Sequence, residues 1–139
     1  MKAIPVGTKG KFELTVATEH LANRFKDQML PPVLATPVLI MVMENAALNA
    51  LKPYLDPVET ALGTSVDIVH LAATPLGRTI VGEAELTEVE GRRLAFTVRV
   101  HDAGEEVGRG RHERTLIDAE KFLARLRAKI ASGGAHDGD

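Results

Sequence analysis

The sequence predicts a single α+β domain in which an antiparallel sheet wraps around one long apolar helix. Three observations support this fold class. The chain has 139 residues, of which 45% are hydrophobic and 26% charged, as expected for one globular domain with a real core. Residues 35–51 form a very apolar segment that holds one charge, Glu44. From residue 62 onward the sequence changes to four β-rich runs.

The first half of the chain predicts a strand, a short helix and then the long helix. Residues 10–19, GKFELTVATE, alternate well enough to predict a strand. Residues 20–35 predict a short helix followed by a loop that prolines interrupt. Thr36 and Pro37 then predict a helix start, because Thr is a good N-cap and Pro is tolerated at the first helical position. This helix should run to about Leu51.

The second half predicts a sheet and a closing helix. The turn sequences TPLG, EG and AG separate the β-rich runs, which predicts an antiparallel meander over residues 62–74, 78–90, 92–102 and 105–117. Asp118 is a suitable N-cap for an amphipathic helix that ends the domain. We expect one domain over residues 1–131 and a disordered tail over residues 132–139.

The long helix needs apolar cover on most sides. A curled sheet alone would leave part of this helix and one sheet edge exposed. We therefore expect a homodimer or a higher homo-oligomer.

Composition excludes several classes of protein. The net charge of −2 argues against nucleic-acid binding, and the absence of cysteine excludes disulfides and thiolate chemistry. The N-terminus has no apolar run of signal-peptide length, so we expect a cytoplasmic protein. Residues 28–51 are long enough to suggest a membrane span, but Pro31, Pro32, Pro37 and Glu44 argue against one.

Glu44 is the most unusual residue of the long helix. Its helical neighbours at spacings of three and four are apolar: Ile40, Met41, Ala47 and Leu48. Moving an unpaired carboxylate from water into an apolar interior costs on the order of several kcal/mol. Glu44 is therefore either a solvent-facing residue of a partly exposed helix or a functional or interface carboxylate.

His70 lies on the more apolar face of its predicted strand, together with Val66 and Ile68. It is either a satisfied core histidine or a partner for Glu44, since a buried carboxylate and a buried imidazole compensate one another's desolvation. By sequence alone, Thr36 is explained as an N-cap, Gly63 as a strand-entry glycine and Arg114 as a surface cation.

Several longer stretches resemble one enzyme family. They are MENAA, PYLDPVETALGT, HLAATPLG, VEGRRLAF, GRGRHER and EKFLARLRAKI, which occur in the same order between Ala35 and Lys129. In this segment the chain resembles the fluoroacetyl-CoA thioesterase branch of the hotdog-fold thioesterases. The resemblance implies a hotdog fold, a long central helix wrapped by an antiparallel sheet and usually paired as a dimer. It also implies hydrolysis of an acyl-CoA thioester to the free acid and CoA.

The resemblance also assigns site residues. It implies that Thr36, Glu44 and His70 carry the chemistry and that Gly63 and Arg114 contact the substrate. The segment before Thr36, RFKDQMLPPVLA, is shorter than the aromatic-rich lid of the family, so we expect a broader choice of small acyl groups.

The expected reaction needs no cofactor beyond the CoA thioester, which is the substrate. Glu44 would act as nucleophile or as general base on water. Eight helical residues span about 12 Å, so Thr36 and Glu44 cannot reach one acyl carbon from one regular helix. Either the Thr36 segment folds back, or the residues meet across a dimer interface. Arginines at the site mouth are candidates for binding the CoA phosphates: Arg92, Arg93, Arg109 and Arg111.

Two other functions stay open. A hotdog hydratase or dehydratase also uses a carboxylate and a histidine, but commonly within one local motif, whereas Glu44 and His70 are 26 residues apart. A non-catalytic acyl-CoA-binding protein would bind these esters without turnover. A metal hydrolase is disfavoured, because the histidines show no HxxxH spacing: His20, His70, His101, His112 and His136.

Overall fold

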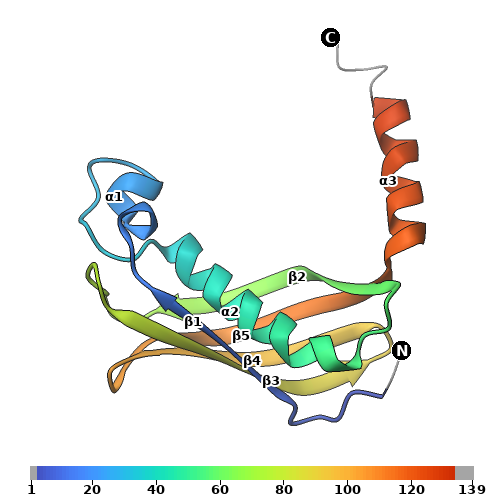
Figure 1. Cartoon of the computed structure of the whole chain (residues 1–139), viewed down its shortest axis with the longest axis horizontal. Helices are drawn as coiled ribbons and strands as arrows, with labels where there is room; N and C mark the ends of the chain where they lie inside the picture. The colour runs from blue at the N-terminus through green and yellow to red at the C-terminus, as the bar shows by residue number, and fades with distance from the viewer. Residues whose placement is uncertain (1–2, 134–139) are drawn as a thin grey trace.

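The computed structural model describes residues 3–133 and has the predicted α+β architecture (Figure 1). One face of a five-stranded antiparallel sheet packs against a long helix. The elements in chain order are β1 (Lys9–Thr15), a 3₁₀ turn η1 (Thr18–His20), α1 (Ala22–Phe25), α2 (Thr36–Leu51), a 3₁₀ turn η2 (Lys52–Tyr54), β2 (Glu59–His70), β3 (Thr79–Glu90), β4 (Arg93–Asp102), β5 (Glu105–Asp118) and α3 (Ala119–Gly133).

The sheet has the strand order β1-β3-β4-β5-β2. The predicted meander is correct for β3, β4 and β5, but β2 pairs with β5 instead of β3. The reason is the connection over residues 71–78, which is longer than a hairpin loop and crosses the end of the sheet. As a result, β2 is an edge strand, and within the described chain its outer side pairs with no other strand.

Helix α2 is buried because its apolar residues face the sheet and two glycines let the strands approach it. Eight of its residues are buried, from Val38 to Leu51. A Cβ atom at Gly10 of β1 would overlap the Ala46 carbonyl oxygen, and one at Gly82 of β3 would lie 2.6 Å from a Val42 methyl group. Glycine at these positions therefore sets the close approach of sheet and helix.

Both predicted helix starts are correct to within one residue, but one of the two predicted N-caps is wrong. Asp118 caps α3 as expected, because its carboxylate accepts a hydrogen bond from the Lys121 backbone N–H at 3.0 Å. In α2 the N-cap residue is Ala35, and Thr36 is already helical. The Thr36 hydroxyl makes no capping bond and instead contacts His70.

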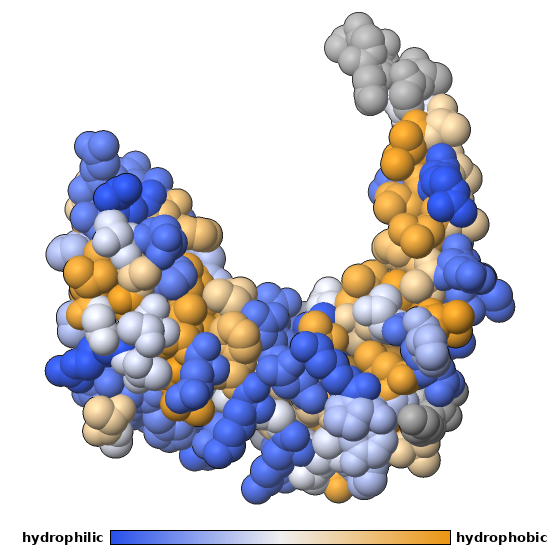
Figure 2. Space-filling model, viewed as in Figure 1, coloured by the Kyte–Doolittle hydropathy of each residue, from blue (hydrophilic) through white to orange (hydrophobic). Residues whose placement is uncertain are grey.

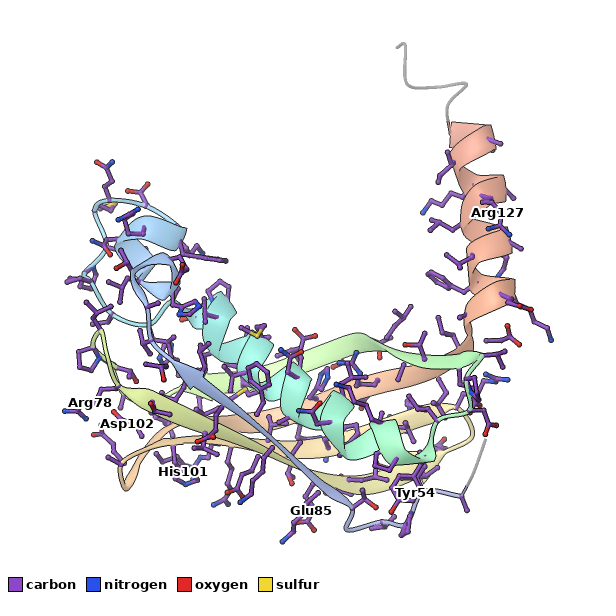
Figure 3. The ribbon with its side chains drawn as sticks, in the orientation of Figure 1. Tyr54, Arg78, Glu85, His101, Asp102 and Arg127 are labelled. Carbon is purple, nitrogen blue, oxygen red and sulfur yellow. The ribbon has the colours of Figure 1, made fainter. Side chains whose placement is uncertain are left out.

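An ion pair fixes one end of the sheet. Asp102, at the end of β4, is 2% exposed and accepts a hydrogen bond at 3.1 Å from Arg78, just before β3 (Figure 3). Pairing the buried carboxylate with a cation offsets its desolvation.

Helix α3 projects away from the body of the molecule (Figure 1). None of its residues is buried, and it continues through Gly133, two residues beyond the predicted domain end at 131. The rest of the predicted tail, residues 134–139, lies outside the described residues. Within residues 3–133 no helix combines the length and the apolar character needed to cross a bilayer.

Candidate active site

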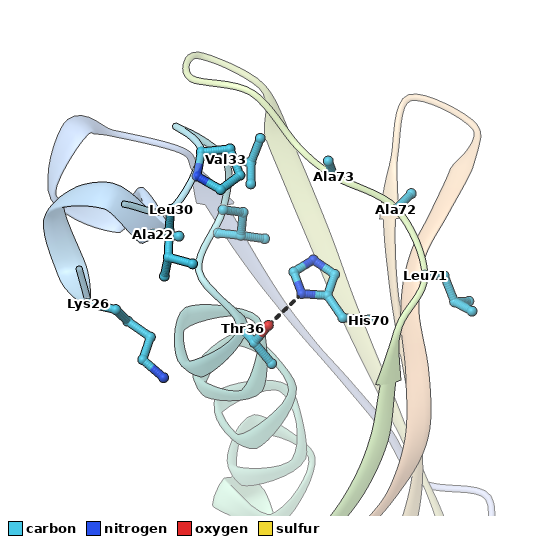
Figure 4. Close-up of a pocket in the computed structure, with 11 residues that line it drawn as sticks. Ala22, Lys26, Leu30, Val33, Thr36, His70, Leu71, Ala72 and Ala73 are labelled. Carbon is cyan, nitrogen blue, oxygen red and sulfur yellow. Dashed lines mark hydrogen bonds between the residues drawn. The ribbon is translucent and has the colours of Figure 1, made fainter. Parts of the chain in front are cut away.

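Thr36 and His70, which are 34 residues apart, meet at one end of the molecule. Thr36 is the first residue of α2, and His70 is the last residue of β2. The Thr36 Oγ1 and His70 Nδ1 atoms are hydrogen-bonded at 2.9 Å (Figure 4). The apolar face predicted for His70 is therefore correct, since this face of β2 turns towards α2.

A pocket of about 450 Å³ opens beside this pair. Its walls are mostly apolar and come from α1, the loop before α2 and residues 71–73. Ala22, Leu30, Val33 and Leu71 are among the lining residues, and Lys26 is the one charged residue of the lining (Figure 4). Apolar walls with a few convergent polar groups are typical of small-molecule sites.

The imidazole of His70 is held in its neutral form. Burial lowers its pKa from the ordinary value of 6.5, and an interaction with the Ala72 backbone offsets part of this effect. The Nε2 atom is buried and has no hydrogen-bond partner among the described residues. A neutral imidazole with one unpaired nitrogen can accept a proton from, or donate one to, a bound molecule.

A second group of site residues lies farther along α2 and consists of Glu44 on that helix, Gly63 on β2 and Arg114 on β5. Glu44 is half-buried, and a Cβ atom at Gly63 would lie 2.7 Å from its Oε2 atom and 3.6 Å from Arg114 Nη1. Gly63 is paired with Arg114 across β2 and β5, next to a bulge. Gly63 is therefore not a strand-entry residue, because β2 begins at Glu59. The missing side chain leaves the Glu44 carboxylate accessible above β2.

Arg114 is a buried cation and not the surface residue that sequence alone would suggest. It is 8% exposed, and its Nε and Nη2 groups donate hydrogen bonds to the Ala61 carbonyl at 3.2 and 2.6 Å. Burial lowers the pKa of Arg114, and the nearby Glu44 charge opposes that shift. A guanidinium stays protonated in proteins, so it supplies a fixed positive charge beside the carboxylate.

His112 completes this group and was missed by the sequence analysis. Its Nδ1 lies 2.9 Å from the Ser65 carbonyl, and its Nε2 lies 3.1 Å from Arg114 Nη1. A carbonyl only accepts and a guanidinium only donates, so Nδ1 must carry the proton and Nε2 must accept. His112 is therefore neutral, in agreement with the burial that lowers its pKa. The alternation R-H-E-R on β5 was the available signal, since it puts His112 and Arg114 on one face.

The five predicted residues thus form two groups, Thr36 with His70 and Glu44 with Gly63 and Arg114. The groups are eight residues apart on α2, about 12 Å along a helix. Thr36 does not fold back, because it lies within the helix. One chain therefore does not bring Thr36 and Glu44 together.

The four arginines considered as ligands of the CoA phosphates do not join either group of site residues. Arg93 forms ion pairs with Glu90 and Glu113, and Arg109 lies 3.5 Å from Glu106. Arg92 donates to the Leu116 carbonyl. Arg109 and Arg111 alternate with buried His112, so they lie on the sheet face away from α2.

Within the described chain, no three His, Asp or Glu side chains converge in a way that could hold a metal ion.

Comparison with known proteins identifies the family. Residues 16–120 match the model of the family described as fluoroacetyl-CoA-specific thioesterase. The chain belongs to this thioesterase family. A fluoroacetyl-CoA thioesterase of Streptantibioticus cattleyicolor is 48% identical over 103 residues, which are 74% of each protein. Family membership makes the chain a thioester hydrolase.

Solved structures agree with this assignment. A structure of the fluoroacetyl-CoA thioesterase FlK has a TM-score of 0.86 and 38% identity, covering 92% of this chain and 98% of the other. A thioesterase superfamily member of Thermus thermophilus has a TM-score of 0.90 and 29% identity, covering 97% and 99%. FlK variants have been solved in complex with fluoroacetate and CoA, and with acetyl-CoA. The predicted hotdog-type fold is thereby confirmed.

Proposed function

We propose that this thioesterase hydrolyses small acyl-CoA esters and that the acyl group of the substrate binds in the pocket beside Thr36 and His70. The pairing of these two residues at an apolar pocket is the observation that carries the proposal. The mostly apolar lining suits a small uncharged acyl group, and the short segment before Thr36 supports a wider choice of acyl groups than fluoroacetyl alone.

We further propose that each active site is shared between two subunits of a homodimer. Leu62, Val66, Val69 and Leu71, on or next to the open edge strand β2, are between 38% and 51% exposed, which is unfavourable for a free edge. Antiparallel pairing of two β2 strands would satisfy this edge. A two-fold axis midway between Gly63 and His70 would then put His70 of one subunit opposite Gly63 of the other.

This pairing resolves the separation of the two groups. Glu44 and Arg114 lie beside Gly63, so the partner would bring them to the Thr36–His70 pair. Glu44 either attacks the thioester carbonyl carbon or removes a proton from the attacking water. His70 orients this carboxylate or activates water, and Thr36 donates a hydrogen bond. Water ends as the hydroxyl of the free acid, and its proton goes to the CoA thiolate.

The first test is the release of free thiol from acetyl-, fluoroacetyl-, butyryl- and phenylacetyl-CoA. Wild type should hydrolyse at least one ester, and Glu44→Gln should lower kcat by ~10²–10⁴, the usual contribution of a general acid or base. Glu59→Gln, a change of the same kind on β2, is the control and should keep most activity. If all esters stay intact while they still raise the Tm, the protein binds acyl-CoA without turnover. Hydration of crotonyl-CoA without thiol release would instead indicate a hydratase.

A further inference from the structure

Helix α3 carries an apolar surface that its own chain does not cover. Phe122, Leu126 and Ile130 follow one another at a spacing of four, so they share one side of the helix, and Leu123 borders them. We call these four residues the α3 stripe. Leu123, Leu126 and Ile130 are 47%, 39% and 64% exposed. An exposed stripe of this kind marks an interaction surface.

The position of α3 indicates what covers the stripe. Helices α1 and α3 rise from opposite ends of the sheet, and both extend beyond the edge strand β2 (Figure 1). A broad hollow lies between them, and apolar surface on α3 borders this hollow (Figure 2). The floor of the hollow is the open β2 edge, which is the proposed dimer interface.

The symmetry of that dimer determines which parts meet. Asp118, the last residue before α3, is paired with Glu59 at the start of β2. The pocket lies at the other end of β2, beside His70 and residues 71–73. A two-fold axis near the centre of β2 exchanges these two ends. The α3 of one subunit therefore rises beside the pocket of the other, and its 15 residues reach about 22 Å.

We propose that the α3 stripe of each subunit packs over the acyl pocket of the partner and forms its outer wall. This inference rests on the proposed function, because it needs the shared dimer. The pocket offers matching apolar surface at the same place, since Leu71 in its lining is 47% exposed. Residues of α3 are then part of the partner's active site and limit the length of the acyl group.

Cross-linking between subunits tests the contact. The chain has no native cysteine, so single cysteines can be introduced without background. The Ala73→Cys variant, with its cysteine in the pocket lining, is mixed with the Leu126→Cys variant. The mixture is denatured and refolded so that the subunits exchange, and it is then treated with a short bismaleimide. We expect a cross-linked dimer. The matched control pairs Ala73→Cys with Ala128→Cys, which lies on the opposite side of α3 and should cross-link at least tenfold more slowly.

Substrate length tests the role of the stripe as a pocket wall. Leu126→Ala should raise the ratio of kcat/KM for hexanoyl-CoA to that for acetyl-CoA at least fivefold, because it removes side-chain volume from the wall. Lys121→Ala, on the side of α3 opposite the stripe, should leave this ratio unchanged. An unchanged ratio for Leu126→Ala overturns the inference, as does equal cross-linking of Leu126→Cys and Ala128→Cys.

The mass of the wild type in solution separates this inference from the proposed function. If light scattering shows a monomer, both the shared active site and the placement of α3 are overturned, because each needs the dimer. A dimer that hydrolyses acyl-CoA but gives no Leu126→Cys cross-link leaves the proposed function intact and overturns the placement of α3 alone.

Discussion

The neutral state of His70 links the stability of the protein to pH. Burial lowers its pKa in the folded protein below 6.5, the ordinary value that applies after unfolding. As the pH falls through 6.5, the unfolded chain therefore takes up a proton that the folded state resists, and stability decreases.

We therefore expect the Tm to fall as the pH is lowered below about 6.5, with a shallower fall in His70→Gln. Scanning calorimetry between pH 7 and 5 measures both slopes. Since burial also lowers the pKa of His112, some pH dependence should remain in the variant. Identical slopes would show that His70 does not contribute.

Gly63 is expected to control the position of the Glu44 carboxylate. In Gly63→Ala the new Cβ atom would lie 2.7 Å from Glu44 Oε2, the mobile end of a side chain, so the carboxylate moves and the backbone does not. We expect kcat/KM to fall by about 10- to 100-fold, as small misplacements of catalytic groups do.

The Tm of Gly63→Ala should stay close to that of the wild type, because no backbone atom blocks the new methyl group. Thiol release and thermal unfolding measured on the same sample distinguish the two effects. A large loss of stability would mean that Gly63 is required for folding and not for the site.

At the scale of elements, the contact between β1 and α2 depends on Gly10. In Gly10→Ala the Cβ atom would overlap the backbone of Ala46 and Ala50, which cannot move independently of the helix. We expect a loss of about 1–3 kcal/mol or more in the free energy of unfolding, the usual range for overpacking. Urea titration measures it, and Lys11→Ala on the same strand is the control, with little expected change.

Elements were predictable where the local pattern determines them. The apolar run ending at Leu51 and the capping residue Asp118 gave α2 and the start of α3 correctly. The partner of β2 was not predictable, because strand pairing depends on the route of residues 71–78 and not on alternation within the strand. Likewise, Thr36 satisfies the local preference for an N-cap but makes a long-range contact with His70 instead.

The site itself was only partly readable from residue patterns. Glu44 stands out, since it is the one charge in an apolar helix. His112 and Arg114 do not, because alternation places them on one face of β5 but does not tell which face meets α2. Their burial follows from tertiary packing. Of these two residues, the family resemblance pointed to Arg114 and not to His112.

At the scale of the whole molecule, a shared site makes a prediction about mixed subunits. Glu44→Gln and His70→Ala should each be inactive as homodimers. After the two are unfolded and refolded together, half of the dimers are mixed, and each mixed dimer has one site without a mutation. We therefore expect about a quarter of wild-type activity.

Thiol release before and after refolding measures this recovery, and each variant refolded alone is the control. Sites built within one subunit would give no recovery, because every chain in the mixture carries a substitution.

The open edge of β2 also has a consequence for the newly made chain. Before it meets its proposed partner, a folded subunit displays the outer side of β2, which pairs with no other strand among residues 3–133, together with exposed apolar side chains. Such an edge joins indiscriminately to other unfinished chains. In the proposed dimer, assembly would therefore compete with aggregation during synthesis, because both processes use the same open edge. Aggregates join more chains than the proposed dimer does, so dilution and rapid recognition between matching edges should both raise the yield of soluble enzyme.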